Sequence, residues 1–344
     1  MTWRFYSHFD IREVIMNNSS LPLVLVTHTL PDGWLGMLKD RCQLVIGPED
    51  ANLISKNLEK NLHKAEGLFT LLTITVDQEL LSKAPNLKVI SNMAVGVDNI
   101  DLAACTSRGI PVGNTPGVLT DGTADLTMAI LLSAARRLFE ANLDAREGRW
   151  KTWSPTGWLG KDLREATLGI VGMGKIGSAV AERAKGFGMK IIFSDPNPRQ
   201  EIATRLGAQQ VPFEDVLQLS DFISLHIPLT EDTRNLIDEM ALQSMKPSAI
   251  LVNTARGQII DPNALLQALI NGWIAGAALD VTDPEPLPPD HPLYELPNCL
   301  IMPHIGSATW NTRRAMAERA SENLLAGLEG RRLPYCVNPE VYQV

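Results

Sequence analysis

A glycine-rich segment, Gly172-x-Gly174-x-x-Gly177, constrains the fold of this chain more than any other feature. It follows a short apolar run (167–171) typical of a buried strand and precedes a stretch (178–187) typical of a helix. The first glycine permits a tight turn, the second lets a pyrophosphate approach the backbone, and the third lets helix and strand pack closely. The pattern predicts a strand–turn–helix unit that binds a dinucleotide at the N-terminus of its helix.

The next expected strand, over 189–194, ends at Asp195. A carboxylate in this place accepts hydrogen bonds from the ribose hydroxyls of NAD and repels the 2′-phosphate of NADP. Arg199 follows shortly after and could contact a 2′-phosphate instead. We therefore favour NAD(H) and keep NADP(H) open. The alternative for the whole segment is a glycine-rich turn without a ligand.

Two series of short apolar runs alternate with helical or polar stretches, which is the pattern of parallel sheets covered by helices. The first series spans 21 to about 116, and the second begins at Thr167. Both indicate the α/β fold class, and a helical stretch from about Ser307 to Glu329 follows them. The expected strands lie at 21–27, 43–46, 67–72, 87–91, 167–171, 189–194, 221–226, 248–253, 274–280 and 299–302.

Between the two series, Asp121 to about Glu147 reads as one helix, with good helix formers and no proline. Its apolar residues surround more than one face, and a helix of this kind must be buried. It either crosses between two domains or also forms a subunit interface, and the pattern alone does not separate these readings.

Composition excludes several classes of protein. The chain has 344 residues, enough for about two domains. Its formal net charge is −8 and no cluster of Lys and Arg exceeds a pair, so we expect no nucleic-acid partner. No apolar run approaches the roughly 18 residues of a membrane span.

Four widely spaced cysteines indicate a reducing, cytoplasmic setting, and no metal-ligand spacing is present. Residues 1–20 read as an extension outside the fold.

Three candidate catalytic residues each follow an expected strand: Arg256, Glu285 and His304. Ligands of open α/β sheets bind beyond the carboxyl ends of the strands, so the three can share one rim. Histidine is the usual proton donor near neutral pH, and a carboxylate bonded to it favours the protonated ring. Arginine offers a fixed fork for a substrate carboxylate. Taken singly, each residue is more often structural: a buried histidine, a helix-capping arginine, an exposed glutamate.

These segments resemble the D-isomer-specific 2-hydroxyacid dehydrogenases over nearly all of 22–335, and most of all the glyoxylate/hydroxypyruvate reductase branch. The matching segments are VGVDNID (95–101), TLGIVGMGKIG (167–177), LHIPLTEDTRNLID (225–238), LVNTARGQIID (251–261), ALDVTDPEPLP (278–288) and PHIGSAT (303–309).

The resemblance implies two doubly wound parallel-sheet domains. A Rossmann cofactor domain (119–308) would be inserted into a flavodoxin-like substrate domain (21–118 plus 309–344). It also implies NAD(P)H-dependent reduction of a small 2-oxo acid, glyoxylate or hydroxypyruvate, to the D-2-hydroxy acid.

The resemblance further implies roles for individual residues. Arg256 holds the substrate's carboxylate and keto oxygen, His304 donates the proton, and Glu285 supports His304. Backbone N–H groups of Val95 and Gly96 bind the carboxylate. Further substrate contacts come from Ser307 and from Trp153, which would reach the neighbouring subunit's site and so implies a homodimer. The implied cofactor contacts are Thr123, Gly172, Gly174, Lys175, Ile176, Gly177, Asp195, Pro228, Thr254, Asp280 and Ser307.

Other activities remain open at this point. The chain could act on another small 2-hydroxy acid or on phosphite, although phosphite dehydrogenases carry a lysine where Val95 stands. Formate dehydrogenases carry glutamine at the position of Glu285. A non-enzymatic, dinucleotide-sensing protein similar to the family's corepressors is the reading from a different class.

Overall fold

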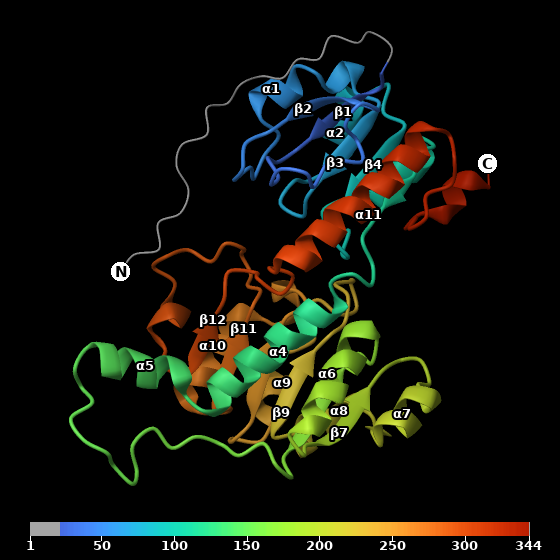
Figure 1. Cartoon of the computed structure of the whole chain (residues 1–344). Coiled ribbons are helices and arrows are strands. Elements are labelled where there is room, and N and C mark those ends of the chain that lie inside the picture. The colour runs from blue at the N-terminus through green and yellow to red at the C-terminus, as the bar shows by residue number, and fades with distance from the viewer. Residues whose placement is uncertain (1–20, 344) are drawn as a thin grey trace. The chain divides into compact units, whose positions relative to one another are not determined.

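The computed structural model describes residues 21–343 and divides them into two compact units (Figure 1). One unit contains the described residues up to Thr115 and those from Met316 onward, and the other is Pro116–Ala315. Residues 116–118 and 309–315, expected with the first unit, belong to the second. Near them, Gly122 lies so close to Thr312 that an added Cβ would stand 3.0 Å from Thr312 Oγ1. The extension predicted for 1–20 lies outside the described residues.

The first unit contains a five-stranded parallel sheet in the order β2-β1-β3-β4-β5. This is the strand order of flavodoxin-like doubly wound folds. Sequence patterns located four of its strands but not β5, whose two residues are too few to form an apolar run. The elements are β1 (Leu23–Val26), β2 (Gln43–Ile46), α1 (Lys56–Glu59), β3 (Gly67–Thr70), α2 (Gln78–Lys83), β4 (Val89–Asn92), α3 (Leu102–Ser107) and β5 (Val112–Gly113).

The second unit contains a seven-stranded parallel sheet in the order β12-β11-β10-β9-β6-β7-β8. Strand order reverses between β6 and β9, and such a switch point is where α/β sheets bind dinucleotides. The elements are β6 (Thr167–Val171), α6 (Lys175–Gly186), β7 (Lys190–Ser194), α7 (Gln200–Leu206), β8 (Gln209–Gln210), α8 (Phe213–Leu219), β9 (Phe222–Leu225), α9 (Glu239–Ser244), β10 (Ile250–Asn253), α10 (Pro262–Asn271), β11 (Gly276–Leu279) and β12 (Cys299–Ile301).

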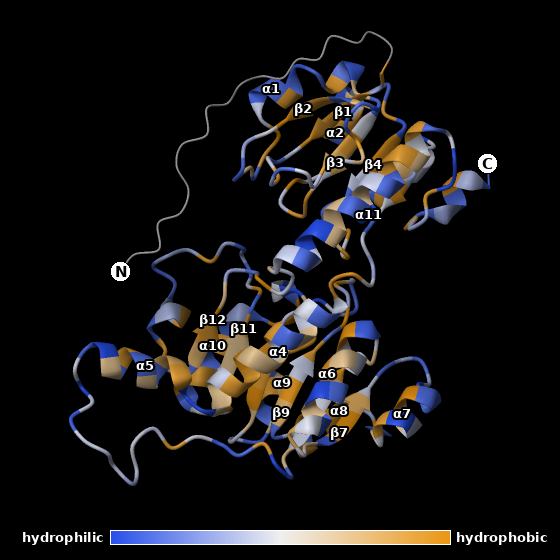
Figure 2. Ribbon diagram, viewed as in Figure 1, coloured by the Kyte–Doolittle hydropathy of each residue, from blue (hydrophilic) through white to orange (hydrophobic). Residues whose placement is uncertain are grey.

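Alternating side chains of this second sheet build two cores, one on each face. Ile170 and Val252 belong to the core covered by α4 (Thr120–Ala135) and α6, whereas Val171 and Leu251 belong to the core covered by α8, α9 and α10. Figure 2 shows the labelled strands as mostly hydrophobic, with polar residues along the helices. A parallel sheet buried on both faces reads as continuous apolar runs, which is why its strands were predictable except β8, which consists of two exposed glutamines.

The prediction of a single helix over 121–147 is wrong, because the structure has two helices there. α4 (Thr120–Ala135) and α5 (Leu138–Arg146) are separated at Arg137, whose φ of +52° is left-handed. Lys161 N donates to the Ala135 carbonyl over 2.7 Å, so a later segment completes the end of α4. Burial was predicted for the whole stretch, but only seven of the 16 residues of α4 are buried, and α5 has no buried residue.

The last long helix, α11, spans Trp310–Leu328, somewhat shorter than the expected 307–329. It is followed by Gly330, whose φ of +70° favours glycine because a Cβ is unfavourable there. None of the helices in the described part of the chain combines the length and apolar character needed to cross a membrane.

Candidate active site

The turn between β6 and α6 has the geometry that its glycines predict. Gly172 has a φ of +94°, and a Cβ on it would stand 2.6 Å from the His226 carbonyl oxygen. A Cβ on Gly177 would stand 2.1 Å from the Gly172 carbonyl oxygen, so the helix packs directly on the turn. A Cβ on Gly174 would meet nothing within 4 Å, which leaves open space beside the backbone. α6 begins at Lys175, earlier than the expected Ser178, because Gly174 is its N-cap.

Asp195 lies at the end of β7 and is held against this turn. Its side chain is only 5% exposed, and it accepts hydrogen bonds from Met173 N (3.0 Å) and Asn197 N (2.9 Å). Arg199 forms an ion pair with it, with Nε 3.3 Å from Oδ2. The open backbone at Gly174, the free N–H groups of the first turn of α6 and this carboxylate together fit NAD.

His226, at the end of the neighbouring β9, completes the wall of this turn. Its Nε2 lies 2.8 Å from Ser224 Oγ, and burial lowers the pKa of His226 to about 3. The ring is therefore neutral at physiological pH, and it is not suited to donate a proton in catalysis.

Glu285 and His304 come together at the carboxyl ends of the neighbouring strands β11 and β12. Oε1 of Glu285 lies 2.5 Å from Nδ1 of His304, and both side chains are half-buried. A carboxylate accepts only, so Nδ1 carries a proton in this pair and Nε2 is the ring nitrogen left for other chemistry. Thr282 N donates to Oε2 of Glu285 over 3.4 Å and helps to orient the carboxylate.

Asp280 holds the backbone that carries His304. Its Oδ1 and Oδ2 accept from Ile305 N and Gly306 N, each over 2.7 Å, and its carbonyl accepts from His304 N over 2.9 Å. His304 has a left-handed φ of +52°, and these three bonds fix that unusual conformation. Burial raises the pKa of Asp280, while the two backbone N–H groups oppose that rise.

Arg256 lies just beyond β10, in a turn packed against the loop that leads to Glu285. A Cβ on Gly257 would stand 1.9 Å from the Thr282 carbonyl oxygen, so only glycine allows this approach. Asn253 Nδ2 donates to the Arg256 carbonyl over 2.8 Å and fixes the start of the turn. The three residues proposed for chemistry thus follow adjacent strands of one sheet.

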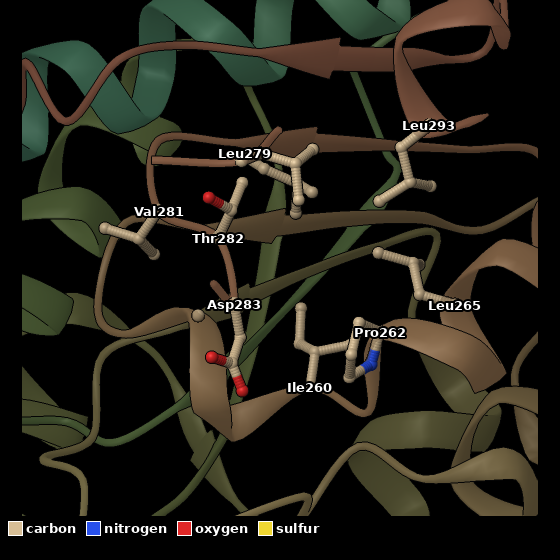
Figure 3. A pocket seen from close by; sticks show the side chains of 10 residues that line it. Ile260, Pro262, Leu265, Leu279, Val281, Thr282, Asp283 and Leu293 are labelled. Atoms are coloured by element: carbon tan, nitrogen blue, oxygen red, sulfur yellow. The ribbon is translucent and has the colours of Figure 1, made fainter. Parts of the chain in front are cut away.

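A small cavity lies behind the loop that carries Glu285. Figure 3 shows the side chains of Leu279, Leu293, Leu265 and Ile260 around it, with Asp283 at its border. Its volume of about 20 Å³ is enough for a single water and far too small for a dinucleotide. These apolar contacts support the loop from behind.

The remaining predicted residues fall into separate groups. Thr127 links two predicted cofactor contacts, because its Oγ1 donates to the Thr123 carbonyl over 2.8 Å and lies 2.9 Å from Thr254 Oγ1. Sequence reasoning missed Thr127, which a helical spacing of four from Thr123 could have suggested. Pro228 and Ser307 lie in the loops after β9 and β12, and Lys175 and Ile176 form the first turn of α6. Val95 and Gly96 follow β4 in the first unit, and Trp153 lies in the segment after α5, 80% exposed.

Comparison with known proteins decides the family. The family model described as D-isomer specific 2-hydroxyacid dehydrogenase, NAD binding domain, matches residues 128–306. A glyoxylate reductase of Korarchaeum cryptofilum is 48% identical over 94% of this chain and 98% of its own length. The chain belongs to the D-isomer-specific 2-hydroxyacid dehydrogenase family. It is an enzyme of this family with an NAD-binding domain, as the motifs predicted.

Solved structures of similar proteins agree with both halves of the fold. The TT0316 protein of Thermus thermophilus is 49% identical, with a TM-score of 0.86 over 92% of this chain and 99% of that one. A glyoxylate reductase of Paecilomyes thermophila is 32% identical, with a TM-score of 0.82 over 93% and 99%. The prediction of an α/β dehydrogenase with two parallel sheets is confirmed.

Proposed function

We propose that this 2-hydroxyacid dehydrogenase reduces glyoxylate or hydroxypyruvate to the corresponding 2-hydroxy acid, with NADH as the reductant. The hydrogen bond between His304 and Glu285, at the carboxyl edge of the NAD-binding sheet, carries the proposal. A proton donor is needed there because reduction of a carbonyl develops negative charge on its oxygen. The resemblance to glyoxylate reductases at up to 50% identity supports this choice of substrate.

NADH, when bound, supplies the hydride, and the protein's own residues supply everything else. His304 gives a proton from Nε2 to the substrate oxygen while Glu285 stabilises the charged ring through Nδ1. Arg256 binds the substrate carboxylate through its planar fork and polarises the neighbouring carbonyl. Ser307, beyond β12, and the N–H groups of Val95 and Gly96 are the further substrate contacts in this scheme.

The cofactor's adenosine ribose is assigned to Asp195, and its pyrophosphate to Gly174, Lys175 and Ile176 at the start of α6. Thr123, Pro228, Thr254 and Asp280 are assigned to the nicotinamide half. The nearly buried carboxylate of Asp195 favours NADH, because a 2′-phosphate beside it would be repelled. Arg199 is engaged in an ion pair with that carboxylate, which leaves it a weaker candidate for a phosphate ligand.

A homodimer forms part of this proposal. α5 presents Leu138 and Phe139, which are 53% and 54% exposed although large and apolar. Beside them, at the amino-terminal edge of the sheet, lies a cavity of about 700 Å³ lined mainly by apolar residues. Exposed apolar surface of this kind indicates a protein–protein contact. Trp153, in the adjoining segment, is the residue assigned to the partner's substrate site.

The direct test is a spectrophotometric panel. NADH and NADPH are each combined with glyoxylate, hydroxypyruvate and pyruvate, and NAD is combined with phosphite. The proposal is supported if, among all the combinations in the panel, glyoxylate or hydroxypyruvate with NADH gives the highest kcat/KM. Faster turnover of pyruvate or phosphite selects another small acid as the substrate, and no turnover with any of them favours a dinucleotide-sensing role.

A reducing, cytoplasmic location is also proposed, since the four cysteines are free thiols and three are buried.

A further inference from the structure

The loop after β4 is held by hydrogen bonds to three consecutive carbonyl groups. The Ala94 carbonyl accepts from Thr115 N over 2.9 Å, and the Val95 carbonyl accepts from Asn114 Nδ2 over 2.8 Å. The Gly96 carbonyl accepts from Asn92 Nδ2 over 2.9 Å. These bonds hold three successive peptide units of the loop in place.

The orientation of the two inner amides follows from their partners. Asn99 Nδ2 donates to the carbonyls of Leu71 (3.2 Å) and Ile74 (2.9 Å), and a backbone carbonyl can only accept. Oδ1 of Asn99 must then face Asn92, whose Nδ2 lies 3.1 Å away and also reaches the Gly96 carbonyl. Both N–H bonds of the fully buried Asn92 are used, whereas its Oδ1 has no partner among the described residues. The side chain of Asn92 therefore acts only as a hydrogen-bond donor, to the Gly96 carbonyl and to Asn99 Oδ1.

Fixing the carbonyls fixes the N–H groups as well. In a planar trans peptide the C=O of one residue and the N–H of the next point in opposite directions. Holding the carbonyls of 94, 95 and 96 inward therefore turns the N–H groups of Val95, Gly96 and Val97 outward. Within the described part of the chain, no oxygen accepts a hydrogen bond from these three N–H groups. Successive outward N–H groups form a concave site that binds anions.

We propose that Asn92 and Asn114 are positioning residues for the substrate carboxylate, acting through the peptide units of Val95, Gly96 and Val97. Asn99 orients Asn92 in turn. This inference rests on the proposed function, because it assumes that the outward N–H groups bind the carboxylate of a 2-oxo acid. Preorganised donors bind and stabilise negative charge without reorganisation, so loosening their carbonyls weakens binding of the carboxylate and leaves the dinucleotide site intact.

The test measures binding of oxalate, a carboxylate that cannot be reduced, to the complex of the full-length protein with NADH. Asn92→Leu and Asn114→Leu remove the two donors, and each should weaken oxalate binding and raise the KM for glyoxylate about tenfold, the loss of one good hydrogen bond. The Kd for NADH should stay within twofold. Asn114→Gln keeps an amide donor at a half-buried position and should recover much of the loss.

Asn338 provides the matched control. It is also a buried asparagine of the first unit, and it bonds Val112 N, Thr106 Oγ1 and the Ile110 carbonyl without touching the loop. Asn338→Leu should lower the Tm yet leave oxalate binding unchanged. Equal oxalate affinity in wild type and Asn114→Leu overturns the inference, as does a wild type that binds no oxalate. Failure of the proposed function is seen separately, as a wild type that binds oxalate but reduces no 2-oxo acid.

Discussion

Oε1 of Glu285 and Nδ1 of His304 lie 2.5 Å apart although the two residues are 19 positions apart in the sequence. Each follows its own strand, and the parallel pairing of β11 with β12 brings the two strand ends together. The pair leaves Nε2 of His304 as the nitrogen that can exchange a proton with a ligand. Most of the functional predictions depend on this arrangement.

Replacing His304 by asparagine tests the proton donor. Asparagine tolerates a left-handed backbone, so His304→Asn should fold like the wild type. The kcat for reduction should fall by roughly two to four orders of magnitude, as removal of a general acid typically causes. The Kd for NADH, measured by fluorescence titration, should change little. A variant that retains more than a tenth of the wild-type kcat contradicts the assignment.

Replacing Glu285 by glutamine tests its partner. The amide keeps an oxygen within reach of Nδ1, but the charged imidazole loses the anion that stabilises it. Reduction requires the charged ring, so the kcat for reduction should fall by about tenfold, roughly the loss of one charge-assisted hydrogen bond, whereas the Kd for NADH should not change. Steady-state kinetics of Glu285→Gln and wild type at one pH measure the loss. An unchanged kcat means that Glu285 does not support His304.

Asp195→Asn tests cofactor selection. The amide keeps an oxygen for Met173 N but removes the negative charge that repels a 2′-phosphate. The ratio of kcat/KM for NADH to that for NADPH should fall by about tenfold, a change of roughly 1.4 kcal/mol. Glu214→Gln, on the surface of α8, is the control and should keep the wild-type ratio. A tenfold preference of the wild type for NADPH would show that Arg199 dominates over Asp195.

Phe139→Glu tests assembly. A charge on the exposed face of α5 cannot be buried in a contact without a large desolvation cost. Sedimentation velocity at micromolar concentration should show a dimer for the wild type and a smaller species for the variant. Phe187→Glu, at the end of α6 and 44% exposed, is the matched control and should remain dimeric. A wild type that is active as a monomer excludes a shared substrate site.

The buried imidazole of His28 should make the stability of the first unit depend on pH. Its Nε2 lies 2.8 Å from the Ala51 carbonyl, and burial lowers the pKa of His28 below its ordinary value of 6.5. Below pH 6.5 the unfolded chain therefore binds more protons than the folded one, and stability falls as the pH falls. His226 adds to this loss in the second unit, since its pKa is lowered to about 3.

Urea denaturation between pH 5 and 8 measures this dependence. His28→Gln should lower stability at pH 8, because hydrogen bonds are lost, yet flatten the decline toward pH 5. His63→Gln, at an exposed position, should leave both the midpoint and the slope unchanged. An unchanged slope in His28→Gln means that this histidine does not titrate differently in the two states.

Local patterns were sufficient for the strands and the glycine turn, but not for contacts made by tertiary structure. Buried parallel strands are continuous apolar runs, so ten of them could be found, whereas β5 and β8 consist of two residues each. The break at Arg137 has no glycine, proline or asparagine to signal it. Asp280 was predicted only as a cofactor contact, because its bonds to Ile305 N and Gly306 N exist only once β11 and β12 are paired.

The left-handed backbone of His304 sets a limit on how far this protein can be improved by selection for heat resistance. A side chain in that region costs about 1 kcal/mol of strain, which glycine does not have, although glycine loses more chain entropy on folding. A library screened only for survival at high temperature should therefore tolerate His304→Gly, and with it lose the ring that faces Glu285. Thermostable designs of this enzyme need position 304 held constant, and their gains must come from sites remote from β11 and β12.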